Sequence, residues 1–242
     1  HVRSLPVETI AERLHDRFRL LKGRDSTAPT RQQSLRATID WSYDHLTEPE
    51  QRVLQRSSVF AGGWTLPAAE AVCGGGEIDP VDVLDLHSGL VDKSLVTVEA
   101  EGSRYNLLET VRQYAQERLE AMGDGDSART RHLDYLVGLA EQARSHFVGP
   151  EEDDWLARFD LERQNLLAAY AWSRQVRGGA AAALRLAYGL RRWMCRGAFD
   201  LGRPVLAQEL AETRASDSAR LRCQGLVAAA FLSYFVGQYE DT

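Results

Sequence analysis

The sequence predicts a mainly α-helical protein in which a winged helix-turn-helix domain with one small β-hairpin precedes an array of helical repeats. Three observations lead to this prediction. Apolar residues recur at helical spacing along most of the chain. One run rich in β-forming residues, between residues 94 and 107, interrupts the helices. Residues 180–200 weakly resemble residues 220–240, a shift of 40 residues that suits a helix-pair repeat.

Turn-forming residues divide the chain into segments. Apolar spacing predicts a helix over Val7–Leu21, and the stretch Gly23–Thr30, which contains a Pro and several small polar residues, predicts a linker. We therefore expect a domain boundary there. The resulting division is residues 1–33, a winged-helix domain at 34–124 and a helical-repeat region at 125–242.

Capping signals mark the first two helices of the winged-helix domain. Ser34 is a candidate N-cap, and Thr47–Glu50 combines a capping Thr, a Pro in the first turn and acids that suit the helix dipole. We expect the second helix to extend as far as Gly62–Gly63. The apolar positions expected to face inward on these two helices are Leu35, Ile39, Tyr43, Leu46, Val53, Leu54 and Phe60.

Two further short helices and the hairpin complete this domain. A helix is predicted over Leu66–Val72, and Asp79-Pro80 opens another. Strands are predicted at Ser94–Val98 and Tyr105–Leu107, with a turn between them. A closing helix then runs to Gly123. The expected inward positions are Val83, Leu86 or His87, Leu90 and Val91 before the hairpin, and Leu108, Val111, Ala115, Leu119 and Met122 after it.

Only helices are predicted beyond residue 125. One carries Leu133–Ala140, a second begins in the acidic run Glu151–Asp154 and continues to Tyr170, and a third covers Ala180–Cys195. In the 40-residue alignment the matched pairs are Leu186 with Leu226, Gly197 with Gly237, and Phe199 with Tyr239.

Residues typical of catalysis or of ligand binding are not arranged in a recognisable pattern. Lys93-Ser94 follows Asp92 rather than the Gly of a phosphate-binding loop, and no G-x-S-x-G or paired-His motif occurs. We therefore predict no catalytic, cofactor-binding or metal-binding residue, and free thiols at the three cysteines. We expect the histidines on surfaces or helix faces, and we expect four tryptophans, Trp41, Trp155, Trp172 and Trp193, in the core.

The charge distribution argues against DNA as a ligand. The net charge is −6, and residues 34–122 carry seven basic and fifteen acidic side chains. The helix before the hairpin, which would enter a DNA groove, contains four Asp residues against Lys93, and the wing sets Glu99 and Glu101 against Arg104. We expect no DNA binding through this segment; the alternative is a winged helix that binds DNA directly as part of a transcription factor.

Five segments in order resemble the bacterial STAND-class regulators, which are NB-ARC-type signal-transduction ATPases of LuxR-like or SARP-like transcriptional regulators. The matching segments are Ser34–Leu46, Phe60–Trp64, Leu90–Val96, Leu107–Ala115 and Glu162–Ala169. The resemblance implies that residues 1–33 are the tail of an ATPase lid domain and a linker, and that a TPR-like array follows the winged helix. It also implies a non-catalytic regulatory segment that couples nucleotide state to the binding of a partner or signal.

The same resemblance sets expectations for ligands and location. ATP or ADP would bind the longer parent protein, whereas the Met-His-Asp motif of the family falls on Leu107-Leu108-Glu109, whose leucines offer phosphate no donor. We expect these leucines in the core and no cofactor in this segment. The expected partners are the protein's own ATPase domain and a signalling protein bound by the repeats. Without a Met start, a signal peptide or a long apolar run, we expect a piece of a longer cytoplasmic protein with no membrane contact.

Overall fold

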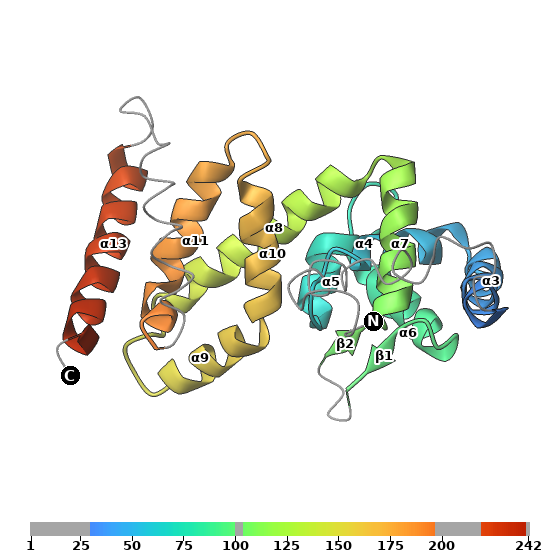
Figure 1. Cartoon of the computed structure of the whole chain (residues 1–242), viewed down its shortest axis with the longest axis horizontal. Coiled ribbons are helices and arrows are strands. Elements are labelled where there is room, and N and C mark those ends of the chain that lie inside the picture. The colour runs from blue at the N-terminus through green and yellow to red at the C-terminus, as the bar shows by residue number, and fades with distance from the viewer. Residues whose placement is uncertain (1–29, 100–103, 197–218, 241–242) are drawn as a thin grey trace, which may run out of the picture. The chain divides into compact units, whose positions relative to one another are not determined.

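The computed structural model describes residues 30–99, 104–196 and 219–240, and confirms a mainly α-helical chain with one small β-hairpin (Figure 1). The predicted helix Val7–Leu21 lies outside the described residues. Of the described residues, one compact unit comprises those up to Val59 and from Thr65 to Gly125, and the other comprises Phe60–Trp64 and those from Asp126 onward. The first unit contains α3 (Thr30–Asp44), α4 (Glu48–Ser57), α5 (Leu66–Cys73), the 3-10 helix η1 (Pro80–Asp82), α6 (Val83–Asp92), β1 (Thr97–Val98), β2 (Tyr105–Asn106) and α7 (Glu109–Met122). The helices α8 (Gly125–Ala143), α9 (Glu152–Leu161), α10 (Arg163–Ser173), α11 (Gly179–Met194) and α13 (Ala219–Glu240) follow.

The first described helix, α3, differs from its prediction in two ways. It already includes Thr30, so Ser34 lies inside the helix rather than capping it; the intervening Arg and Gln residues are good helix formers. Ile39 and Tyr43 are buried as expected. Trp41 is 65% exposed, because a residue midway between two inward positions faces outward. Its ring centroid lies 4.3 Å from that of His45, with the two rings tilted by 42°.

Helix α4 begins with the predicted capping signal. The Glu50 amide donates to Thr47 Oγ1 at 3.4 Å, and the Thr47 amide donates to a Glu50 carboxylate oxygen at 2.8 Å. This reciprocal pair satisfies two backbone donors that the first turn would otherwise leave without partners. The helix ends at Ser57, earlier than predicted, so Phe60 lies beyond it.

Two buried charges on α4 fix the ends of the neighbouring helices. Arg56 Nε donates to Asp124 Oδ2 at 2.6 Å, and Arg56 Nη1 donates to the carbonyls of Cys73 at 2.7 Å and Gly75 at 3.0 Å. Glu50 forms an ion pair with Lys93, directly after α6. A Cβ on Gly89 would lie only 2.7 Å from Glu50 Oε1, so a glycine there leaves room for the carboxylate.

Helix α6 buries Val83, His87 and Leu90, which resolves the alternative between Leu86 and His87 in favour of His87. His87 Nδ1 lies 3.1 Å from the Val83 carbonyl, and its ring centroid is 5.1 Å from that of Tyr105. His132 is buried as well, which differs from the expectation that the histidines lie on surfaces or helix faces.

The hairpin is shorter than predicted because its first residues complete α6. Ser94 has a left-handed φ of 58°, and the amides of Leu95 and Val96 both donate to the Leu90 carbonyl. Pairing therefore starts at Thr97, which is opposite Asn106 in an antiparallel register.

The closing helix α7 buries only the middle of its predicted apolar face. Val111, Ala115 and Leu119 are buried. Leu108 and Met122 are 58% and 63% exposed, which corrects their expected core positions, because they flank or end the helix, beyond the surface that packs on α4.

The second unit has one apolar core formed by α8, α9, α10, α11 and α13, and it includes Trp193 with partly buried Trp155 and Trp172 at its edge. Gly189 lets α8 and α11 approach closely, since a Cβ there would lie 2.8 Å from Ala140. The helix predicted from Glu151 to Tyr170 is two helices that break at Glu162.

The aligned residues of the 40-residue repeat do not share the same burial. Leu186 is 3% exposed and Leu226 is 55% exposed. Gly197 and Phe199, members of the other two pairs, lie outside the described residues.

Removing the Thr47 cap should destabilise the first unit. We expect Thr47→Ala to lower the free energy of unfolding by about 1 kcal/mol, because the Glu50 amide loses its acceptor. Thr47→Ser keeps the hydroxyl and should retain most of the stability. Urea denaturation checks both variants, and an equal loss in the two would show that the cap does not matter.

The burial of His87 predicts a pH-dependent stability. Burial lowers the pKa of His87 from its ordinary value of 6.5 to about 4. Between these values the unfolded chain binds a proton that the folded chain does not, so stability falls as pH drops from 6.5 towards 4. The expected loss is roughly 3 kcal/mol.

Comparison of the wild type with His87→Leu isolates this contribution, because His132 titrates in both proteins. The expected result is that the denaturation midpoint of the variant depends less steeply on pH over this range. Parallel pH profiles would contradict a buried neutral His87.

Candidate functional site

The outward face of α6 is the surface on which a winged helix would read a ligand, since this helix directly precedes the hairpin (Figure 1). Val83, His87 and Leu90 face inward at helical spacing, which leaves Leu84, Asp85 and Ser88 exposed. Val81 and Leu84 are 80% and 44% exposed. Both fall off the inward spacing, and that signal could have identified them from the sequence.

The same face carries a concentration of negative charge. Asp79, Asp82, Asp85 and Asp92 are all exposed, and none forms an ion pair with a basic side chain in the described part of the chain. Asp79 Oδ1 accepts a hydrogen bond from the Val81 amide, which starts η1. Lys93 pairs with Glu50, so its charge is already engaged. We call the exposed surface of Asp79–Asp92 the acidic face.

The wing adds no accessible cation next to the acidic face. Arg104 is 6% exposed, and its guanidinium therefore cannot approach a phosphate without rearrangement. Glu99 is exposed and accepts a hydrogen bond from Asn106 Nδ2 at 3.0 Å. Val98 in the wing is 39% exposed.

These properties favour protein over phosphate as a ligand. Like charges repel by roughly 1 kcal/mol at 4 Å even in water. Each exposed Asp is negatively charged, as is a phosphate, so each would repel a nucleic-acid backbone. Exposed aliphatic side chains beside carboxylates are instead compatible with a partner that has an apolar contact and a basic rim.

The segment matched to the nucleotide-contacting motif is arranged for intrachain contacts. Leu108 is 58% exposed, and Leu107 is partly buried. The Glu109 carboxylate accepts hydrogen bonds from Arg112 at 2.9 Å and from Gln113 at 2.7 Å. Neither leucine has a side-chain donor for a phosphate, and Glu109 is held by its own helix.

Within the described ranges, no three His, Cys, Asp or Glu side chains gather as a metal site, and no helix is both long and apolar enough to cross a bilayer. Cys73 and Cys195 are buried free thiols, and burial raises the pKa of Cys195 to about 11.

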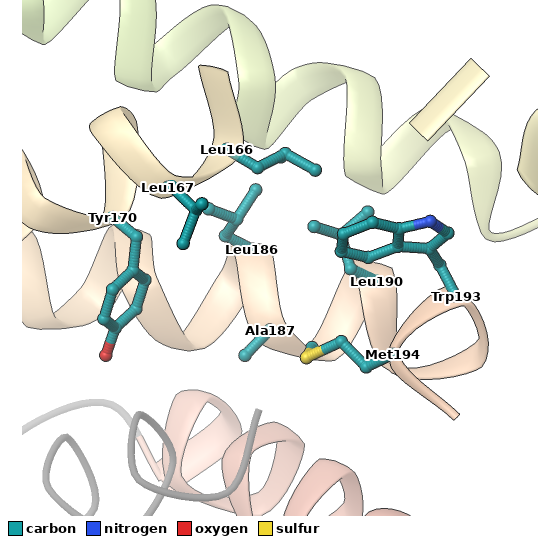
Figure 2. Close-up of a pocket in the computed structure, with 8 residues that line it drawn as sticks. All are labelled: Leu166, Leu167, Tyr170, Leu186, Ala187, Leu190, Trp193 and Met194. Atoms are coloured by element: carbon teal, nitrogen blue, oxygen red, sulfur yellow. The ribbon is translucent and has the colours of Figure 1, made fainter. Parts of the chain in front are cut away.

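The second unit contains an apolar pocket between α10 and α11 (Figure 2). Leu166, Leu167 and Tyr170 come from α10 and lie across from side chains of α11. The pocket's remaining lining residues are Leu186, Ala187, Leu190, Trp193 and Met194. Such a lining suits an apolar side chain and offers no charged group for orientation.

Comparisons with known proteins found similarity to part of a regulator. No family model and no solved structure matches the chain. Over 195 residues it is 46% identical to Rv0890c of Mycobacterium tuberculosis (strain ATCC 25618 / H37Rv) and to Mb0914c of Mycobacterium bovis, both named as candidate HTH-type transcriptional regulators. That match covers 78% of this chain and 21% of the relative. The chain is also 42% identical over 134 residues to the uncharacterized protein Rv0894 of M. tuberculosis, covering 54% of this chain and 34% of that protein. The chain thus spans about a fifth of the length of the HTH-type relatives that it matches.

Proposed function

We propose that this chain is a non-catalytic regulatory and protein-interaction segment of a STAND-class, ATP-dependent transcriptional regulator. The observation that carries this proposal is the acidic face, whose aspartates form no ion pair with the residues that the structure describes and occupy the position of a recognition helix. The similarity to a regulator over most of this chain supports a role in transcriptional control. ATP or ADP would bind elsewhere in the longer cytoplasmic protein, and no cofactor is assigned to this segment.

In this proposal the winged helix and the helical array have different partners. The acidic face would dock on the protein's own ATPase domain, with Val81 and Leu84 as the apolar contact and the aspartates opposite basic side chains. The helices from α8 onward would form a TPR-like array that binds a signalling protein. A change of partner at either site would shift the nucleotide-dependent equilibrium of the whole regulator.

Charge reversal on the acidic face tests the docking. We expect the double variant Asp82→Lys, Asp85→Lys to weaken binding to the separately purified ATPase domain by on the order of tenfold or more, because two attractive pairs become repulsive. The control is Asp134→Lys, Asp154→Lys, which changes the net charge equally at exposed positions of the second unit. Isothermal titration calorimetry with ADP and with ATP measures both variants. Equal affinities for the two variants, or no binding by the wild type in either nucleotide state, would contradict the proposal.

Direct DNA binding is the second candidate, and the name of the HTH-type relatives favours it. The acidic face argues against it, since phosphate binding requires Lys or Arg that release counterions. We expect no change in fluorescence anisotropy when the chain is added to labelled duplex DNA at about 50 mM salt. Binding that weakens steeply as salt increases would establish the DNA-binding alternative.

A further inference from the structure

The central part of the loop between α4 and α5 belongs to a different unit from the two helices that the loop connects. Both helices belong to the first unit, whereas Phe60–Trp64 belongs to the second. Phe60 and Trp64 are 2% and 1% exposed. We call this five-residue segment the latch.

A single side chain binds the backbone of the latch. Asn165 Oδ1 accepts hydrogen bonds from the amides of Ala61 at 2.9 Å and Gly62 at 3.4 Å, and Asn165 Nδ2 donates to the Gly63 carbonyl at 2.9 Å. Asn165 is 1% exposed. Its amide therefore has both its acceptor and its donor engaged by three consecutive latch residues.

A second contact orients that amide. Asn165 Nδ2 also donates to Glu162 Oε2 at 2.7 Å, and Glu162 is 5% exposed. Glu162 is the residue at which the chain breaks between α9 and α10. The break therefore places a carboxylate within one helical turn of Asn165, which fixes which end of the amide donates.

Aromatic packing anchors both ends of the latch. The rings of Phe60 and Trp64 are stacked at 5.1 Å with an interplanar angle of 13°. The ring of the buried His132 forms a T-shaped pair with that of Phe60, with ring centroids 5.1 Å apart and an interplanar angle of 86°. Large aromatic side chains bury more apolar area than other residues, so the Phe60–Trp64 pair stabilises the latch by apolar burial. The hydrogen bonds of Asn165 fix the position of the latch backbone.

We propose that the latch couples the stability of the second unit to that of the first unit, which contains the helices on either side of the latch. Asn165 is the residue that holds the latch in position. Loss of the latch would leave the buried Asn165 side chain without its three backbone partners and would remove the aromatic pair from its site. Because Val59 and Thr65 continue directly towards α4 and α5, opening of the latch would also loosen the ends of those helices. The two units would then open together rather than independently.

Hydrogen exchange of the full chain tests the coupling. We compare the wild type with Asn165→Asp, which keeps the size and an acceptor but replaces the donor with a charge beside Glu162. We expect exchange to rise by about tenfold or more in three peptides together, covering the latch, α10 and the start of α5. The control is Gln164→Ala, which removes an exposed amide side chain from the same helix and should leave exchange unchanged.

A milder variant keeps the test decisive if Asn165→Asp does not fold. Phe60→Leu retains an apolar side chain and loses the stacking on Trp64, so the same three peptides should exchange faster in a folded protein. Faster exchange confined to residues 60–64 in Phe60→Leu, with α5 and α10 unchanged, would overturn the proposal. An equal effect of Gln164→Ala would do the same.

Discussion

The architecture of the winged-helix unit depends on the two buried charges of α4. Glu50 and Arg56 have side chains that are 9% and 7% exposed. Arg56 binds the backbone at the C-terminal end of α5 and the Asp124 carboxylate after α7, while Glu50 binds Lys93 after α6. One helix therefore fixes the C-terminal ends of three others. Removing Lys93 or Asp124 would leave a buried charge without its ionic partner, which makes these contacts difficult to replace.

This arrangement determines which side of α6 is exposed. The ion pair between Lys93 and Glu50 and the inward packing of Val83, His87 and Leu90 leave the aspartates in solvent. The same ion pair engages the lysine that lies next to those aspartates. A helix in the position of a DNA reader thus presents carboxylates and aliphatic groups, and its chemistry suits a protein surface.

The sequence identifies features whose signals are local. Thr47–Glu50 forms the capping box because all of its partners lie within one turn, and the hairpin follows from adjacent β-forming runs around a turn. The absence of recognisable catalytic motifs and the excess of acids before the hairpin are likewise properties that can be read from the chain.

Features that depend on tertiary contacts could not be predicted in this way. Tryptophan is usually buried, yet Trp41 is exposed because it lies midway between the inward-facing Ile39 and Tyr43. The sequence leaves Leu86 and His87 as alternatives for one inward position, and the contacts of His87 with Ser57 of α4 and Tyr105 of the hairpin decide between them. The break at Glu162 has no Pro or Gly, and the contact of Asn165 with the latch joins residues about a hundred positions apart.

Carboxylate footprinting tests most directly whether the acidic face is open to solvent. The intact chain is treated briefly with a water-soluble carbodiimide and an amine, and the modified side chains are located by mass spectrometry. We predict rapid labelling of Asp79, Asp82, Asp85 and Asp92, and slow labelling of the buried Glu50 and Glu162. Protection of Asp82 and Asp85 to the level of Glu50 would show that the aspartates are covered or paired, and would contradict the account.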